Sequence, residues 1–329
     1  MKTSQIIILL SFPMHSIDLE TLLVTVFVIV DDWSQKAVPP RNHLPGVKPK
    51  LSESEILTLA LIMDYLPFPG ETQFLGFIKA NYGSWFPNLL DQSRRLHLPK
   101  RKVPAATFGQ FNRRLRRLEG KLETLRRSWV KQLEALAEAN FLIDTKPLPV
   151  VGYRRSKQQS NFSGSADYGY CAARKLKYFG YKLVMLCTLS GLPIAYDLVP
   201  ANTDERQAVA EVLSQVGGSD VYGDKGFIGQ DWQEQIHHST GNRIWTIHRS
   251  NQHRQPSSEL KRLISRVRQR IEGVFHEIQN TGRNPERLLN KTIEGFTTHI
   301  AAKIASHTLR ILLHCQYGID VLTFRAFSV

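Results

Sequence analysis

The segment VYGDKGF, residues 221–227, ends a short apolar run on an aspartate and continues into Lys225 and a second glycine. Valine and tyrosine favour β-strands, whereas aspartate and glycine are common in turns. The segment therefore predicts a buried strand that ends at Asp224. Two interpretations of Asp224 follow: an ordinary surface turn residue, or a carboxylate held at a strand end to bind something charged.

An earlier segment, FLIDTKPLPVV (141–151), predicts another buried strand, with Asp144 near its end and Pro147 stopping it. Between 152 and 177 we expect a polar loop. The rest of this part predicts, in chain order, a hairpin of strands at 178–189 and 192–199, a helix at 204–218, the strand at 221–224, a helix at 231–240, a strand at 243–249 and a helix at 257–280. This order, β-β-β-α-β-α-β-α, predicts an α/β fold with a mixed sheet flanked by helices.

The long helix at 257–280 carries a third acid. Its apolar residues recur at the spacing of one helical face: Leu260, Leu263, Ile264, Val267, Ile271, Val274, Phe275 and Ile278. At about 100° per residue, Glu272 falls beside this apolar stripe, with Arg268 on the same edge one turn earlier. Glu277 is predicted to point to the opposite, solvated side and is set aside. Glu272 is therefore the third candidate.

Three carboxylates from two strands and one helix can bind divalent metal ions, because Mg²⁺ prefers hard oxygen ligands. Two such ions about 3.5–4 Å apart activate an attacking oxygen and stabilise a leaving oxygen in phosphoryl transfer. Each acid also has an ordinary structural explanation: a turn cap for Asp144, a turn residue for Asp224 and pairing with Arg268 for Glu272. Their joint placement is the more specific signal.

The composition indicates a polyanionic partner. The 329 residues carry a formal net charge of +14 and are 42% hydrophobic, which suits one large domain or two smaller ones. Residues 94–131 hold 13 Lys or Arg against two acids, and residues 243–270 hold eight against one. A solvated face is the ordinary explanation of one such cluster, but two clusters flanking candidate acids favour a nucleic-acid track.

A membrane role is the weaker alternative. The apolar segment LLVTVFVIV (22–30) is far too short to span a bilayer, and it predicts a buried helix. Residues 1–13 make a poor signal peptide, and Met14 offers another start, so we interpret them as a candidate spurious extension. The three cysteines have no metal-ligand spacing, which fits a reducing cytosol and argues against structural zinc.

The N-terminal part predicts a helix at 14–35, a Pro-rich connector, and then a helix that begins at a capping box formed by Ser52 and Glu55. One or two short helices are predicted within 71–92, and a last helix around 108–118. The last helix is amphipathic, with Phe108, Phe111, Leu115 and Leu118 on one face and Arg113, Arg114, Arg116 and Arg117 on the other. This pattern favours a helix-turn-helix-like DNA-binding domain. A helical bundle with a basic, solvated face is the alternative.

The ordered segments LIDTKP, VYGDKGF and RQRIEGVF resemble the three catalytic blocks of bacterial insertion-sequence DDE transposases, most closely the group named after insertion sequence 982. The segment 180–206 resembles the hairpin and helix that lie between the first two blocks. The resemblance extends from about residue 14 to near the C-terminus. It implies a ribonuclease-H-like catalytic domain with a C-terminal helix over 136–329, preceded by an all-α DNA-binding domain over 14–135.

By this resemblance, Asp144, Asp224 and Glu272 form the catalytic triad and bind two Mg²⁺ or Mn²⁺ ions. Such enzymes hydrolyse the DNA strand at the end of the mobile element and join the freed 3′-hydroxyl to target DNA, without a covalent enzyme intermediate. The implied partners are the terminal inverted repeats and target DNA, with a homodimer in the synaptic complex. The implied location is the bacterial cytoplasm, at the nucleoid.

Several basic residues are predicted DNA contacts. Lys225 and Arg268 adjoin the acids, although a solvated turn lysine explains Lys225 as well. Arg249 is a weaker candidate, and Arg113, Arg114 and Arg117 belong to the helical part. Four positions depart from the family pattern and put accessory DNA contacts in question. Val184 stands where relatives have histidine, and Phe227 where they often have tyrosine. On the long helix, Ser265 replaces a tyrosine and Gln279 replaces a lysine. Trp245 is expected in the core more than on a DNA base.

Two other functions compete with transposition. The first is a related nuclease that cuts DNA without joining strands. The second is a non-catalytic DNA-binding protein derived from a transposase, which the presence of all three acids argues against.

Overall fold

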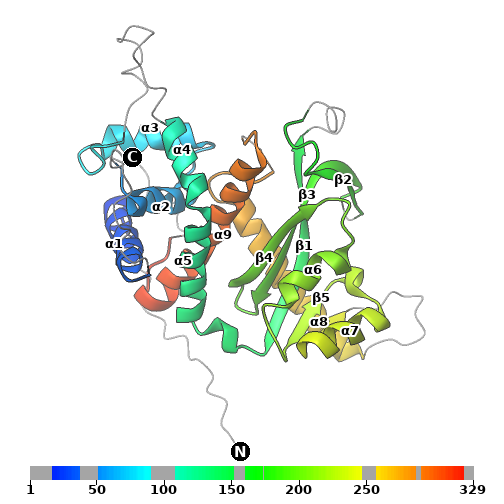
Figure 1. Ribbon diagram of the computed structural model, residues 1–329. Helices are drawn as coiled ribbons and strands as arrows, with labels where there is room; N and C mark the ends of the chain where they lie inside the picture. Colours follow the sequence, from blue (N-terminus) through cyan, green and yellow to red (C-terminus); the bar gives the residue numbers. More distant parts are fainter. Residues whose placement is uncertain are drawn as a thin grey trace, which may run out of the picture.

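The computed structural model describes residues 17–37, 51–89, 108–151, 160–172, 174–246, 257–286 and 290–321. Figure 1 shows two parts side by side: a group of helices that contains α1 to α5, and a curled sheet with α6, α7 and α8 around it. The long helix α9 (Ile293–Tyr317) runs between them. No helix in these ranges is long and apolar enough to cross a membrane.

The helical part follows the apolar pattern of the sequence. Its helices are α1 (Leu19–Ala37), α2 (Glu53–Ile62), α3 (Glu71–Asn81), α4 (Phe108–Arg117) and α5 (Glu119–Gln132), with the short 3₁₀ turns η1 (Met63–Tyr65) and η3 (Ala135–Ala137). The predicted capping box is confirmed, since the Ser52 side chain accepts from the Glu55 N–H and the Glu55 carboxylate accepts from the Ser52 N–H. Phe111, Leu115 and Leu118 are buried, as predicted.

The sheet has the order β2-β3-β1-β5-β6, and β4 also pairs with β3. At its centre, β1 (Asn140–Val151) is antiparallel to β3 (Leu176–Thr188) and parallel to β5 (Asp220–Gly223), which is parallel to β6 (Arg243–Thr246). The strands β2 (Asp167–Cys171) and β4 (Pro193–Pro200) pair with successive segments of β3. The predicted β3–β4 hairpin is confirmed, with Gly191 in the left-handed region at φ +90°.

Two predictions about these strands are wrong. Strand β1 does not stop at Pro147 but continues through Pro147 and Pro149 to Val151. Because β5 pairs with β1 only as far as Leu142, no strand in the described ranges pairs with this edge of β1 beyond that residue, and a proline without an N–H is tolerated there. The expected loop before β3 contains β2, which pairs with residues 176–180 of β3.

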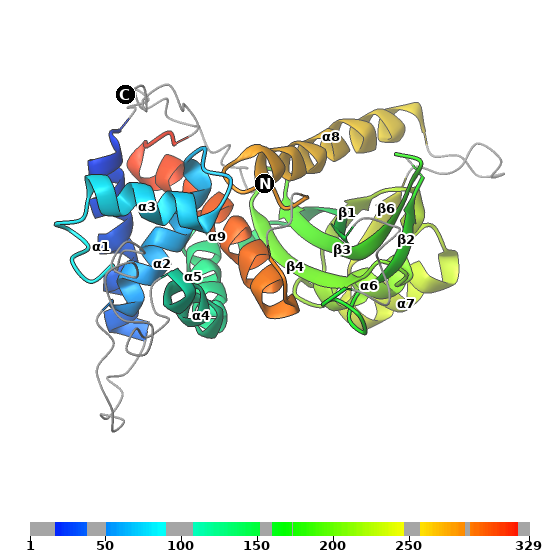
Figure 2. The same ribbon diagram turned by 90° about the horizontal axis from the view of Figure 1, so that it is seen from above.

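Helices cover both faces of the sheet (Figure 2). On one face, α6 (Glu205–Leu213) and α7 (Gln230–Thr240) pack with Phe141 and Ile143 of β1. On the other, α8 (Ser258–Asn280) packs through Ile271, Val274 and Phe275 on Leu142 and Leu148. Since side chains alternate along a strand, Asp144 lies on the α8 face.

Helix α9 joins the two parts. Its residues Phe296, Ile300 and Ile304 belong to the core beneath α8, whereas Ala302, Ala305 and Leu309 belong to the core of the N-terminal helices. The two cores therefore share one helix.

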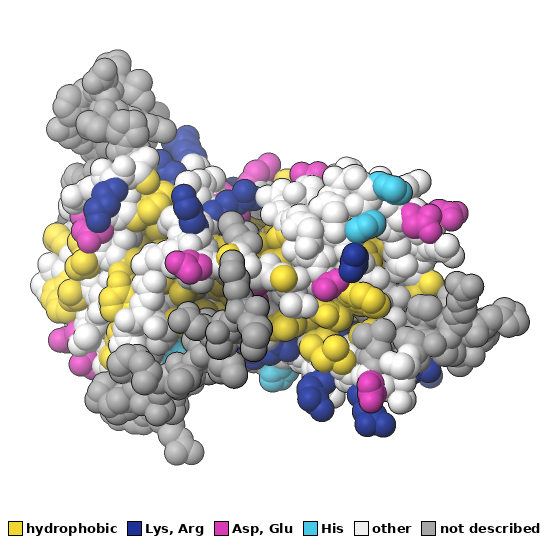
Figure 3. Space-filling model, turned by 90° about the horizontal axis from the view of Figure 1, so that it is seen from below, with side chains coloured by type: hydrophobic (Ala, Val, Ile, Leu, Met, Phe, Trp, Pro, Cys, Tyr) yellow, Lys and Arg dark blue, Asp and Glu magenta, His cyan; other side chains and the backbone are white. Residues whose placement is uncertain are grey.

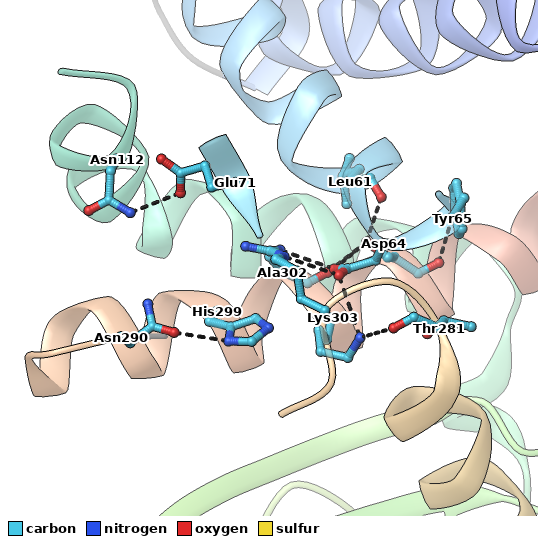
Figure 4. A network of polar contacts seen from close by, with 12 residues as sticks. Leu61, Asp64, Tyr65, Glu71, Asn112, Thr281, Asn290, His299, Ala302 and Lys303 are labelled. Atoms are coloured by element: carbon cyan, nitrogen blue, oxygen red, sulfur yellow. Dashed lines mark hydrogen bonds and ion pairs between the residues drawn. The ribbon is translucent and has the colours of Figure 1, made fainter. Parts of the chain in front are cut away.

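A buried ionic network fixes α9 to η1 (Figure 4). The Asp64 carboxylate lies 3.2 Å from Arg283 Nη2 and 3.5 Å from Lys303 Nζ, and all three side chains are less than 10% exposed. Lys303 also donates to the Thr281 carbonyl at 2.6 Å. Buried charges need such partners, so the network fixes how α9 and the end of α8 meet the N-terminal helices.

Candidate active site

A pocket of about 360 Å³ opens where β5 ceases to pair with β1. Its lining includes all three predicted acids, Asp144, Asp224 and Glu272, together with Arg268. The other residues around it are Thr145, Pro147, Tyr170, Cys171, Ala172, Tyr178, Lys182, Glu205 and Phe227. Residues separated by up to 128 positions in the chain thus converge on one site.

Each acid reaches the pocket for a local reason. Asp144 projects from the middle of β1, and Asp224 directly follows β5, which lies beside β1. Glu272 borders the apolar stripe by which α8 packs on the same face. The turn after β5 is tight, because a Cβ on Gly223 would lie 2.5 Å from the Phe227 ring. Glycine at position 223 therefore allows Phe227 to fold back beneath the pocket.

Arg268 lies between two of the acids. Its Nη1 is 3.2 Å from Asp224 Oδ1 and its Nη2 is 3.4 Å from Glu272 Oε1, while its Nε is buried without a hydrogen-bond partner. The predicted Arg268–Glu272 pairing is present, and it extends to Asp224. Within the described ranges, no three Asp, Glu, His or Cys side chains are arranged to hold a metal ion. Arg268 and Lys182 both contribute positive charge to the pocket lining.

The pocket changes the ionisation of Asp144. Burial raises its pKa to about 7, and repulsion from Asp224 and Glu272 adds to the rise. The Thr145 N–H, which donates to Asp144 Oδ1 at 2.8 Å, and the Arg268 guanidinium act in the opposite direction. Burial thus disfavours the ionised carboxylate of Asp144, and a bound cation would stabilise it.

Comparison with known families decides the class of protein. Residues 138–309, more than half of the chain, match the family model described as the transposase DDE domain. The chain belongs to this family. The matched range of the transposase domain begins just before β1 and contains all three acids. No curated protein and no solved structure matches the chain. The resemblance to DDE transposases is thereby confirmed, whereas the narrower group named after insertion sequence 982 stays a prediction.

The transposase domain has a fourth acid in its pocket that the sequence did not reveal. Glu205, in the first turn of α6, has Oε1 3.5 Å from Thr145 Oγ1. Its Oε2 packs on Gly226, where a Cβ would lie only 1.9 Å away. Glu205 therefore touches the residue after Asp144 and the turn after Asp224. An acid in the first turn of a helix is common, so no sequence signal marked it.

The predicted DNA contacts have different surroundings. On α4, Arg113 and Arg117 are exposed, whereas Arg114 is half-buried and donates to the Leu51 carbonyl. Lys225 begins the 3₁₀ turn η5 (Lys225–Phe227), but its side chain lies outside the described part, as does Arg249. Of the predicted contacts with described side chains, Arg268 lines the pocket.

Two further predictions concern residues outside the pocket. Glu277 does not face solvent: it pairs with Arg310 of α9 and with Arg270, so the prediction of a solvated side is wrong, because α9 packs there. Trp245 is half-buried and not in the core as predicted, and its indole N–H donates to Asp220 Oδ1 at 2.8 Å, across the β5–β6 pair. Gln279, which replaces a lysine of related transposases, accepts from Lys146 Nζ at 2.8 Å.

Proposed function

We propose that this chain is a DNA transposase that cleaves DNA at the ends of a mobile element and joins the freed 3′-hydroxyl to target DNA. The convergence of Asp144, Asp224 and Glu272 on one pocket of a transposase DDE domain carries this proposal. The sheet, with antiparallel β1, β3 and β4 followed by parallel β5 and β6, supports the assignment of a ribonuclease-H-like core.

The donor set of the pocket fits divalent metal. Carboxylate oxygens are the ligands that Mg²⁺ and Mn²⁺ prefer, and the carboxylates of Asp144, Asp224 and Glu272 line the pocket. We assign Asp144, Asp224 and Glu272 as the residues that would hold two ions. When bound, such ions activate the attacking oxygen and stabilise the leaving oxygen of a phosphoryl transfer. The Arg268 guanidinium pairs with Asp224 and Glu272 and offsets part of their negative charge, and it lies where it can contact a phosphate.

The helical part is proposed to hold the DNA. Arg113 and Arg117 on the exposed face of α4 are suited to contact phosphates. Arg114, half-buried on the same helix, adds to the local positive charge. The proposed partners are terminal inverted repeats and target DNA. A homodimer would bring two element ends together, and the bacterial nucleoid is the expected place of action.

Cleavage of labelled element-end DNA tests the proposal. We expect Asp144→Asn, Asp224→Asn and Glu272→Gln each to abolish metal-dependent cleavage, because each removes a charged ligand, while a gel shift shows that DNA binding persists. Chelation of the metal should have the same effect in the wild type. Glu211→Gln, on the exposed side of α6, is the matched control and should cleave normally.

The products distinguish the three candidate functions. Strand-transfer products support a transposase, nicks without joining indicate a nuclease, and binding without cleavage indicates a non-catalytic DNA-binding protein. An acid whose variant cleaves at nearly the wild-type rate is wrongly assigned. Short inverted repeats in the DNA that flanks the reading frame would provide the substrate.

A further inference from the structure

The hairpin of β2 and the first residues of β3 lies at the pocket but contains none of the three acids. Strand β2 is antiparallel to residues 176–180 of β3, and the two strands contribute Tyr170, Cys171 and Tyr178 to the pocket lining. The polar residues of this segment predicted a loop and not a strand. The hairpin therefore needs an explanation beyond the chemistry of the acids.

Tyr170 is an exposed aromatic ring at the rim of this pocket. It is 59% exposed, whereas Tyr168, two residues earlier, is half-buried and packs edge-on against Phe179 with ring centroids 5.1 Å apart. Strand β2 lies at the edge of the described sheet, and the Tyr170 side chain projects from its face. The ring of Tyr170 thus offers apolar surface to whatever enters the pocket.

The same hairpin carries exposed positive charge. Lys177 lies directly opposite Tyr170 in the β2–β3 register, so the two side chains lie on the same face. Lys175, in the turn, is also exposed and has a left-handed backbone at φ +48°, a conformation that glycine adopts with less strain. A phosphate backbone passing Tyr170 would meet both lysines.

The hairpin is tied to the catalytic strand. Arg174 Nη1 in its turn is 3.0 Å from Glu286 Oε1, and the same oxygen is 3.4 Å from Lys146 Nζ. Lys146 is two residues beyond Asp144 on β1 and is buried against Phe275 and Gln279 of α8. The pairing of β2 with β3, together with the contacts of Glu286 with Arg174 and Lys146, links the hairpin that carries Tyr170 to the strand that carries Asp144.

We propose that the β2–β3 hairpin guides the end of a DNA strand into the pocket, with an unpaired base stacked on Tyr170 and the backbone beside Lys175 and Lys177. This proposal rests on the proposed function. A phosphate placed at the acids brings its adjacent bases to the rim of the pocket, where Tyr170 lies. Stacking on an aromatic ring serves any base, because every base has a π face. Lysines hold the phosphates as point charges without reading sequence.

A fluorescent base tests this arrangement without relying on catalysis. The probe is a short DNA duplex with a frayed end that carries 2-aminopurine at an unpaired position, mixed with the full chain in a chelating buffer that prevents cleavage. We expect the wild type to quench 2-aminopurine at the frayed end and not inside the duplex. Tyr170→Ala should lose the quenching and bind the frayed end about 10-fold more weakly, the scale of one base–aromatic stack.

Three further variants complete the test. Tyr170→Phe should keep the quenching, because the ring is retained, and Tyr317→Ala should behave as wild type, since Tyr317 is an exposed tyrosine at the end of α9. Lys177→Gln should keep the quenching but lower the salt dependence of binding by about one phosphate contact. Quenching by Tyr170→Ala equal to that of the wild type overturns the proposal, as does loss of quenching in Tyr170→Phe.

The result also separates this inference from the proposed function. A wild-type chain that cleaves element-end DNA without changing the 2-aminopurine signal overturns the role of the hairpin alone. A wild-type chain that binds no DNA overturns the transposase assignment, and the inference with it.

Discussion

At the scale of single residues, Asp144 controls how the pocket responds to pH. Its folded pKa of about 7 lies above the ordinary value of 3.8, so between these two pH values the folded chain holds a proton that the unfolded chain has lost. Stability falls wherever the folded state binds more protons and pH rises. We therefore expect the metal-free protein to lose stability from about pH 4 to about pH 7 through this residue.

Urea denaturation in chelating buffer across this range measures the effect. Because other groups also titrate, the informative quantity is the difference between the wild type and Asp144→Asn, which cannot ionise at this position. The variant should gain stability relative to the wild type as the pH rises. Parallel stability curves for the two proteins would contradict the raised pKa.

The acids also show which site residues can be predicted from local sequence patterns. Asp144, Asp224 and Glu272 were selected because each adjoins a predicted strand end or apolar stripe, and the structure brings all three to one pocket. Glu205 carried no such signal, since its position depends on how α6 packs beside β1. The position of Arg268 between Asp224 and Glu272 likewise required the fold, although its pairing with Glu272 followed from their four-residue spacing.

At the scale of elements, the Asp64 network is the junction between η1, α9 and the segment after α8. Burial by itself raises the pKa of Asp64, but Arg283 and Lys303 outweigh it and hold that pKa below its ordinary value. Asp64→Ala would leave two buried cations without their carboxylate. We expect a loss of about 3–5 kcal/mol in the free energy of unfolding, as for other broken buried ion pairs.

The control for this prediction is Arg127→Ala on α5. Arg127 pairs with Glu123 at 2.9 Å, but its side chain is 59% exposed, and surface pairs contribute about 1 kcal/mol or less. Urea denaturation of both variants provides the comparison. A loss in Asp64→Ala no larger than that in Arg127→Ala would show that the junction does not depend on these charges.

The errors in predicting elements have one physical origin. Strand β2, with the sequence DYGYC, has no apolar run and forms because residues 176–180 of β3 provide a partner. A proline such as Pro147 usually ends a strand, but here none of the strands that the structure describes pairs with one edge of β1 at that point. The predicted solvent side of Glu277 is covered by α9. In each case pairing or packing with another element decided the outcome, whereas the helices that were predicted and the β3–β4 hairpin followed from local patterns.

At the scale of the whole molecule, the net charge of +14 predicts a large electrostatic contribution to DNA binding. The positive charge is not equally suited to DNA binding over the whole surface, however. On the face shown in Figure 3, Lys and Arg side chains are scattered among acidic and apolar ones. On α4, by contrast, Arg113, Arg114, Arg116 and Arg117 lie within five consecutive residues, and Arg113 and Arg117 are exposed. We therefore expect α4 to account for a measurable share of the phosphate contacts.

The salt dependence of DNA affinity tests this expectation. For the wild type, the logarithm of the affinity should fall steeply and linearly with the logarithm of salt concentration, because each phosphate contact releases condensed counterions. Replacing Arg113 and Arg117 together by Gln should reduce the slope by about 2, one for each lost contact. Arg127→Gln is the matched control, since its guanidinium is already paired with Glu123. A slope unchanged by the double replacement would place the DNA on another face, and a flat response in the wild type would show that the positive charge of this transposase does not serve to bind DNA.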